Sequence, residues 1–353
     1  MKARHDTPTA VASHHRRNAL FLVAGLLAGA VQVSAATFNV LDHGAVADDK
    51  TDNSAAFAKC MDTVIAAGGG RMLLPEGVYR GRIVIPPVSK PTPSWVTVEI
   101  VGEGAPTPVF GTIGDFPLRQ QGTILKCLET TGAAVISASP STNSLYGGFS
   151  GVHVVIRDVD VRTCDNPPIG GIDLQWAMQA RLENVFVNTG VYNVQASKPS
   201  RESKGLVTPG LNNAAWTVLR NVVVTGYSTG IECNEHTDGD NIVVASNLHG
   251  LVFAKAHHAS RFGRVGAYRN THHVTVRGRH GFSIQQLNIE KAGSGQTDEN
   301  NAWQTTRHDL NDPDNLGVGD ITHWVVLGNV GAVEDFNRNG GVNVRVRRIG
   351  AAP

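Results

Sequence analysis

The most constraining feature of this sequence is a short motif that recurs about every two dozen residues. The motif is an aliphatic residue, any residue, a polar residue and then a Val-x-Val pair or a close variant of it. Its polar member falls at Asp158, Asn184, Asn221, Asn241, Arg264 and Asn288, which gives spacings of 26, 37, 20, 23 and 24 residues. A strand-forming unit repeated at a nearly fixed interval is the signature of a solenoid, in which each repeat packs on its neighbours. We therefore predict one repeat per coil, with the asparagines stacked in a hydrogen-bonded ladder.

A second motif, which begins with glycine, indicates which side chains face inward. It reads Gly171-Ile172-Asp173-Leu174, Gly230-Ile231-Glu232-Cys233, Gly250-Leu251-Val252-Phe253 and Gly281-Phe282-Ser283-Ile284. Strand alternation places the second and fourth members in the interior and the third members outside. Cys233 is then a buried apolar residue and is not expected in a disulfide.

The 37-residue spacing is too long for one coil and predicts an insertion. Residues 197–213 contain Pro199 and Pro209 together with several charged side chains, a composition typical of a surface loop. We expect a surface insertion of about 15 residues there.

The N-terminal part has its own ordered motifs. Asp42-His43-Gly44-Ala45 is followed by an acidic stretch at 48–52, an apolar helical stripe, Gly68-Gly69-Gly70 and Pro75-Glu76-Gly77-Val78-Tyr79. This order predicts a strand, a helix that begins after Thr51, Asp52 or Asn53, a glycine stop and a second strand.

The series resembles the opening of the pectate-lyase superfamily, a group that includes pectate lyases, rhamnogalacturonases and tailspike-like proteins. The resemblance covers about 45 residues. It implies an all-β fold, a single-stranded right-handed parallel β-helix (solenoid) with an N-terminal helical cap. On this basis residues 36–94 form the strand–helix cap, residues 95–353 form the coils, and the aspartates of the cap are turn residues.

Residues 1–35 are typical of a signal peptide. Four basic residues, Lys2, Arg4, Arg16 and Arg17, precede an apolar run over 19–33 and the small residues Ser34-Ala35-Ala36. The run is about 15 residues long, whereas a membrane-spanning helix needs about 20, so a membrane anchor is the less favoured alternative. We expect a secreted or periplasmic protein that has no membrane association after cleavage.

Charge and cysteine content exclude several classes. With 31 basic and 30 acidic residues the net charge is +1, so the chain lacks the basic excess of a nucleic-acid binder. Four cysteines are too few for a disulfide scaffold, and no C-x-x-C pair indicates a zinc or redox site.

Acidic residues concentrate in one segment that is a candidate active site. Residues 232–240 hold four carboxylates and one imidazole, and Asp173 is expected on the same outer face. Paired carboxylates suit glycoside hydrolysis, retaining at about 5–5.5 Å and inverting at about 6.5–9.5 Å. The predicted catalytic residues are Asp173, Glu232, Glu235, Asp238 and Asp240. Two alternatives stay open: oxygen ligands for Ca²⁺, or a solvated acidic turn with no catalytic role.

Basic and aromatic residues nearby are candidate substrate-binding groups. We predict His236, Arg261, Arg264 and Trp176 for this role, because cations attract an acidic polysaccharide and also serve β-elimination at a uronate. The Asn-Thr-Asp and Arg-Ile-Lys motifs of polygalacturonases and the Trp-Ile-Asp-His motif of calcium-dependent pectate lyases are absent. Pectin is therefore not predicted as the substrate.

These observations predict an exported enzyme, monomer or homotrimer, that cleaves glycosidic bonds of an acidic polysaccharide by hydrolysis or β-elimination. No metal ligand is assigned. The alternative from another class is a non-catalytic glycan-binding or surface-adhesion solenoid.

Overall fold

The strands of this protein run parallel and stack coil upon coil. A computed structural model describes residues 35–88, 95–104, 122–128, 132–142, 150–163, 170–189, 203–210, 215–254, 257–268, 270, 272–277, 282–290, 303–305, 318–327 and 343–348, with only the backbone described at 276, 289–290 and from 303 onward. The chain divides into two units, Met1–Ser34 and Ala35–Pro353. The first unit, and with it nearly all of the predicted signal peptide, lies outside the described residues. Within them, no helix has the length and apolar character needed to cross a membrane.

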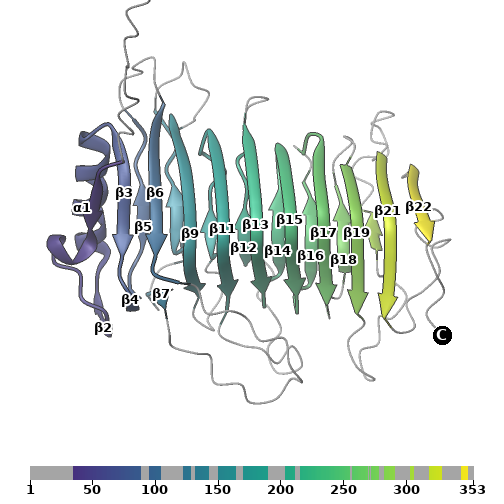
Figure 1. Cartoon of the computed structure of the whole chain (residues 1–353), viewed down its shortest axis with the longest axis horizontal. Coiled ribbons are helices and arrows are strands. Elements are labelled where there is room, and N and C mark those ends of the chain that lie inside the picture. Colours follow the sequence, from purple (N-terminus) through teal and green to yellow (C-terminus); the bar gives the residue numbers. More distant parts are fainter. Residues whose placement is uncertain are drawn as a thin grey trace, which may run out of the picture. The chain divides into compact units, whose positions relative to one another are not determined.

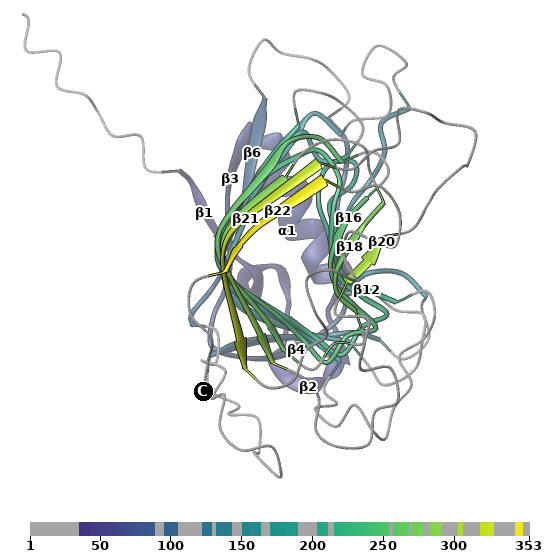
Figure 2. The ribbon, with the colours of Figure 1, turned by 90° about the vertical axis from the view of Figure 1, so that its right-hand side faces the viewer.

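The second unit contains two parallel sheets that face each other across an apolar interior (Figure 1, Figure 2). The larger sheet follows the order β1 (Thr37–Asn39), β3 (Gly69–Leu74), β6 (Val96–Gly102), β9 (Val152–Arg162), β11 (Gln179–Asn188), β13 (Trp216–Thr225), β15 (His236–Ala245), β17 (Ser260–Tyr268), β19 (Phe282–Glu290), β21 (Val318–Leu327) and β22 (Asn343–Arg348), with β2 (Asp48–Asp52), β4 (Gly77–Arg80) and β7 (Thr123–Lys126) beside this path. The smaller sheet follows the order β5 (Ile83–Ile85), β8 (Ile136–Ala138), β10 (Ile172–Asp173), β12 (Lys204–Val207), β14 (Thr229–Cys233), β16 (His249–Phe253), β18 (His272–Val276) and β20 (Trp303–Thr305). One coil therefore contributes one strand to each sheet, which is a parallel β-helix.

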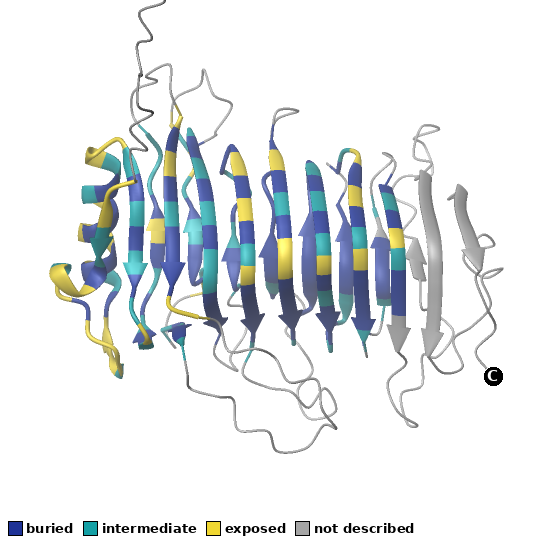
Figure 3. Ribbon diagram, viewed as in Figure 1, coloured by how far each residue is buried: buried dark blue, intermediate teal, exposed yellow. Residues whose placement is uncertain are grey.

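Alternation along the strands separates core from surface (Figure 3). In β3 and β6, buried and less buried positions alternate, as expected for a sheet with one solvated face. The interior positions predicted from the glycine-led motif are all buried, namely Ile172, Leu174, Ile231, Cys233, Leu251, Phe253, Phe282 and Ile284. Cys233 is a free, buried thiol, as predicted.

Close contact between neighbouring coils explains why this motif begins with glycine. A Cβ on Gly230 would lie 2.6 Å from the carbonyl oxygen of Gly250 in the next coil and 2.8 Å from Nδ2 of Asn247. The coils come too close at this position for any side chain.

A helix, α1 (Ser54–Ala66), lies at the N-terminal end of this unit, next to β3 and β5 (Figure 1). Phe57, Met61 and Val64 are on its buried face and belong to the same core as the strands. Asn53 precedes the helix, but its side chain holds the turn by bonding Val46 and Arg80, while Asp52 Oδ1 accepts the Ser54 N–H at 2.9 Å. A 3-10 turn, η1 (Val40–His43), lies before it.

The predicted polar ladder is present over four coils. Asn184 donates to Asp158, Asn221 to Asn184 and Asn241 to Asn221, each at 2.9 Å. All four residues have φ between 51° and 58°. Asn and Asp tolerate this left-handed conformation better than other side chains, so the bends in β9, β11, β13 and β15 select them.

The prediction for the sixth ladder residue is wrong. Arg264 takes the position after Asn241, but its register partner in β19 is Gln286. Asn288 lies two residues further along, opposite Gly266. The sequence pattern had aligned Asn288, and not Gln286, with the ladder. The two residues are two positions apart and lie on the same face of the strand, so the pattern does not distinguish them.

Two other sequence alignments are corrected by the topology. Residues 204–207, expected inside the surface insertion 197–213, form strand β12 between β10 and β14, with Leu206 fully buried. The remainder of that insertion, apart from residues 203 and 208–210, lies outside the described residues. Phe282-Ser283-Ile284 belongs to the larger sheet in β19, and β18 takes its expected place beside β16.

Candidate functional site

The structure divides the predicted site residues among four places. Asp173 and Glu232 lie on the outer face of the smaller sheet, Glu235 and His236 lie at the corner that leads into the larger sheet, and the others follow on the larger sheet or pack against the core. The single cluster of five carboxylates predicted from the sequence is therefore not formed.

Asp173 and Glu232 occupy one row across three coils. Asp173 pairs in register with Val207, and Val207 pairs with Glu232. Neighbouring strands are about 4.8 Å apart, so the two backbone positions are separated by roughly 9.6 Å. Two acids on next-adjacent coils, one of the two arrangements that the sequence motif allowed, face the same side of the sheet.

The environments of these two carboxyl groups differ. Burial raises the pKa of Asp173, the backbone N–H of Gln175 and the Lys204 ammonium lower it, and the nearby Glu232 raises it again, for a net upward shift. Glu232 is 9% exposed and forms an ion pair with Lys204, whose Nζ lies 2.8 Å from its Oε1. Asp173 is thus a carboxyl group with a raised pKa, whereas Glu232 has a positively charged partner in direct contact.

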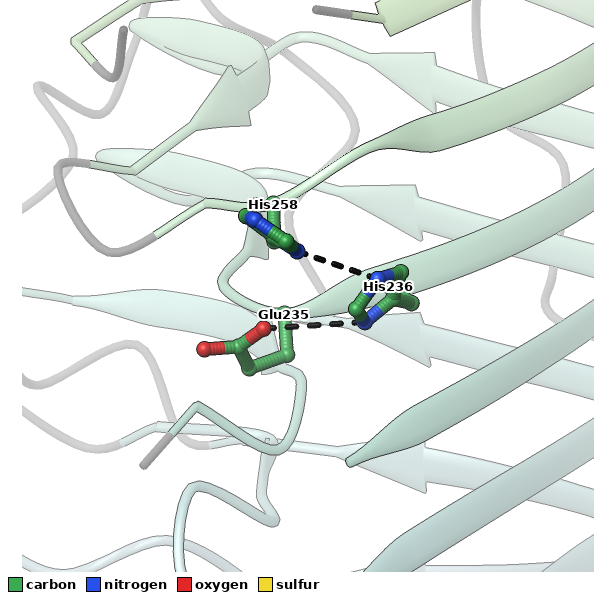
Figure 4. Close-up of side chains that lie close together, drawn as sticks. All are labelled: Glu235, His236 and His258. Atoms are coloured by element: carbon green, nitrogen blue, oxygen red, sulfur yellow. Dashed lines mark hydrogen bonds and ion pairs between the residues drawn. The ribbon is translucent and has the colours of Figure 1, made fainter. Parts of the chain in front are cut away.

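The corner between β14 and β15 holds a second group of ionisable side chains (Figure 4). Nε2 of His236 lies 3.0 Å from Nδ1 of His258, and Nδ1 of His236 lies 3.6 Å from Oε2 of Glu235. Burial raises the pKa of Glu235, although the charges of His258 and His236 lower it in part. We name these three residues the corner cluster.

Neighbouring residues hold the corner cluster in place. The indole of Trp216 stacks on the His236 ring with centroids 5.7 Å apart and planes within 5°. The Glu235 N–H donates to the Pro209 carbonyl at 3.0 Å, and the His258 N–H donates to the Asn234 carbonyl at 2.9 Å. These contacts span three consecutive coils, so the orientation of the cluster depends on the stacking of the coils.

The remaining predicted acids are surface groups of the larger sheet. Asp240 forms an ion pair with Arg220 at 3.2 Å, and both side chains are about half exposed. Asp240 also accepts the backbone N–H of Arg264 at 3.3 Å. Asp238 is in register with the exposed Arg261. Exposed pairs of this kind contribute little to stability and carry no sign of a reaction centre.

Trp176 is not placed as a sugar-stacking platform. It is partly buried and packs against the core, and its backbone carbonyl accepts the Ser150 N–H at 2.8 Å. Among the described residues, Trp95 and Trp216 are the exposed tryptophans, at 47% and 45%. Each has one ring face against a histidine, His153 or His236.

Two residues of this region were missed by sequence reasoning. Lys204 was assigned to the surface insertion, and its position two residues before Leu206-Val207 in a Gly-Leu-Val strand is the signal that would have placed it. His258 stands among many basic residues and has no local signal, because its partners come from the preceding coil.

Fold and site together define a parallel β-helix with acidic residues on its outer face. A family model described as "Rhamnogalacturonase A/epimerase, pectate lyase-like" matches residues 37–295, and the chain belongs to this family. The predicted resemblance and the right-handed parallel β-helix are thereby confirmed. No match was found among curated proteins.

Solved structures show the same fold at low sequence identity. The enzymatically active domain of tailspike protein 2 from bacteriophage CBA120 is 12% identical, with a TM-score of 0.50, over 90% of this chain and 46% of that one. DFA-IIIase from Arthrobacter chlorophenolicus A6, solved in complex with GF2, is also 12% identical, with a TM-score of 0.50, over 82% of this chain and 71% of that one. The chain spans about half the length of the tailspike domain it matches.

Proposed function

We propose that this protein is an exported enzyme that hydrolyses glycosidic bonds of a polysaccharide at the outer face of the smaller sheet. Asp173 is the general acid, and Glu232 is the carboxylate that activates water. The observation that carries the proposal is the row Asp173–Val207–Glu232, in which two acids with different environments face the same side of the β-helix.

The two acids suit the two tasks of an inverting hydrolase. Inverting enzymes hold their carboxyl groups about 6.5–9.5 Å apart so that a water molecule fits beside the sugar. The backbones of the two residues are separated by two strand spacings, roughly 9.6 Å, which favours the wider inverting separation over the shorter retaining one. Asp173, with its raised pKa, would protonate the leaving oxygen while Glu232 takes the proton from water.

Lys204 contacts one acid of the pair. Its Nζ lies 2.8 Å from Oε1 of Glu232, and its charge lowers the pKa of Asp173 only in part, against the larger effect of burial. Because the Lys204 side chain is 44% exposed, it also offers a cation to a sugar carboxylate, which is the support for an acidic polysaccharide as substrate.

Export is supported by two features. Residues 1–35 have the composition of a signal peptide, and Cys127 is disulfide-bonded, a state favoured in oxidising compartments. Cell fractionation tests this part: recovery of the protein in the cytosol with residues 1–35 still attached would contradict export.

The test of the activity is a panel of acidic and neutral polysaccharides incubated with the purified full-length protein. We expect new reducing ends without ultraviolet absorbance, loss of at least about 100-fold of the activity in Asp173→Asn and Glu232→Gln, and full activity in the control Asp240→Asn. Products that absorb as unsaturated uronates would contradict hydrolysis in favour of β-elimination. Binding of glycans without cleavage by the wild type would favour the adhesion alternative.

A further inference from the structure

We propose that the corner cluster, Glu235, His236 and His258, binds one divalent transition-metal ion, of which Zn²⁺ is the representative. This site is distinct from the Asp173–Glu232 row and does not depend on the proposed hydrolysis. The ion would join two consecutive coils, because Glu235 lies between β14 and β15, His236 begins β15 and His258 lies before β17.

The first argument is the convergence of ligand atoms. One atom from each of the three side chains can be chosen so that all lie within 4.8 Å of one another. In the part of the chain that the structure describes, this is the one such group of three. Figure 4 shows the carboxylate and both imidazoles directed toward one another from two coils.

The second argument is the state of the buried polar atoms. Oε2 of Glu235 and Nδ1 of His236 are both buried and have no hydrogen-bond partner among the described residues. They face each other at 3.6 Å, which is too long for a hydrogen bond. Buried polar atoms normally have partners, and two potential ligand atoms left without one are accounted for by an ion between them.

The third argument is the spacing. Zinc bonds of about 2.0–2.2 Å in tetrahedral geometry place neighbouring ligand atoms roughly 3.3–3.6 Å apart. The contact between Oε2 of Glu235 and Nδ1 of His236, 3.6 Å, lies at the upper end of this range, and Nδ1 of His258 lies 3.0 Å from the other ring nitrogen of His236. His236 presents a different ring nitrogen to each neighbour, so binding through one of them requires the Glu235 or the His258 side chain to rotate toward that nitrogen.

The ligand types select the metal. Two imidazoles and one carboxylate suit Zn²⁺ and other first-row transition ions, whereas Ca²⁺ prefers six to eight oxygen ligands. The calcium alternative considered from the sequence therefore does not fit this cluster. Three protein ligands leave one coordination position for water. The Trp216 ring, stacked on His236, fixes the orientation of that imidazole.

The decisive experiment measures binding of the metal alone, without substrate. Full-length protein without a polyhistidine tag is stripped with chelator and titrated with ZnCl₂ by calorimetry, and bound zinc is counted by elemental analysis after gel filtration. We expect one equivalent of retained Zn²⁺, a higher melting temperature with Zn²⁺, and visible absorption bands of a low-coordinate complex with Co²⁺.

Matched variants separate the cluster from incidental binding. We expect Glu235→Gln and His258→Gln each to weaken Zn²⁺ binding more than tenfold and to lose the zinc-dependent rise in melting temperature. His272→Gln should retain both, because His249 and His272 form a similar histidine pair across coils, with centroids 4.8 Å apart, and belong to no three-ligand group among the described residues. Circular dichroism of the metal-free variants checks that each is folded, and having two variants keeps the test valid if one is not.

Two results would overturn the proposal. One is a stripped wild type that takes up no Zn²⁺ or Co²⁺. In that case His236 and His258 form only a hydrogen-bonded pair, with Glu235 beside it. The other is unchanged zinc binding in both variants, which would place the ion elsewhere. Neither result bears on hydrolysis by Asp173 and Glu232, which is measured separately.

Discussion

The side-chain amide of Asn221 donates a hydrogen bond to Oδ1 of Asn184 at 2.9 Å, across a sequence separation of 37 residues. Both residues have positive φ, and the same contact repeats in the coils before and after them. One side chain therefore serves two purposes, the bend of its own strand and the connection to the next coil.

Replacing Asn221 by alanine is expected to destabilise the protein by about 2–3 kcal/mol, the sum of about 1 kcal/mol for hydrogen bonding and 1–2 kcal/mol for a left-handed backbone without Asn or Gly. Asn221→Gly is the matched control, because glycine removes the side chain but accepts the conformation, and it should cost about half as much. Urea denaturation of the two variants measures both values. Equal losses would contradict a conformational role for this asparagine.

Replacing Asp173 by asparagine is expected to abolish activity and yet stabilise the fold at neutral pH. Burial raises the pKa of Asp173 in the folded protein above its ordinary value of 3.8. Below that ordinary value the carboxyl is protonated in both the folded and the unfolded state, so the difference in stability between the wild type and Asp173→Asn does not change with pH. As pH rises to the folded pKa, ionisation favours the unfolded state, and the wild type loses stability relative to the variant.

The measurement is the difference in unfolding free energy between the wild type and Asp173→Asn from pH 3 to pH 8. The advantage of the variant should appear above pH 4 and then become constant. An advantage that is already complete at pH 3 would show that it does not come from ionisation of Asp173.

Replacing Leu206 by alanine tests whether residues 204–207 are part of the coil. In a surface insertion this change costs less than about 0.5 kcal/mol, whereas a fully buried leucine costs about 2–5 kcal/mol. Thermal or urea unfolding distinguishes the two. Val84→Ala, at a 40% exposed position of β5, is the control and should have little effect.

The thiols of Cys60 and Cys233 are expected to resist alkylation in the native protein. Both are buried, and burial raises the pKa of Cys60 to about 11 and that of Cys233 further still. Thiolate is the reactive form, so both should react only when the protein is unfolded. Peptide mapping after labelling with and without denaturant checks this, and rapid native labelling of Cys233 would contradict its place in the interior.

The local motifs of the chain determined which residues bend and which face inward. Backbone sterics require Asn or Asp at the left-handed bends of four long strands, and burial requires aliphatic residues at alternating positions. Both requirements act within a single coil, so the repeat, the interior row and four members of the polar ladder were predictable. Backbone sterics and burial do not limit the length of the irregular segments that connect the strands. The pattern therefore missed β12 and misplaced Asn288 by two residues, because a shift of two keeps every side chain on its own face.

Only the tertiary structure decided which acidic residues meet. Glu232, Glu235 and Asp238 are close in sequence, but the corner after Cys233 turns the chain from one sheet to the other and separates them. Their partners come instead from other coils: Lys204 reaches Glu232, and His258 reaches His236. Contacts across coils depend on register between strands about two dozen residues apart, and no property of a single coil specifies that register.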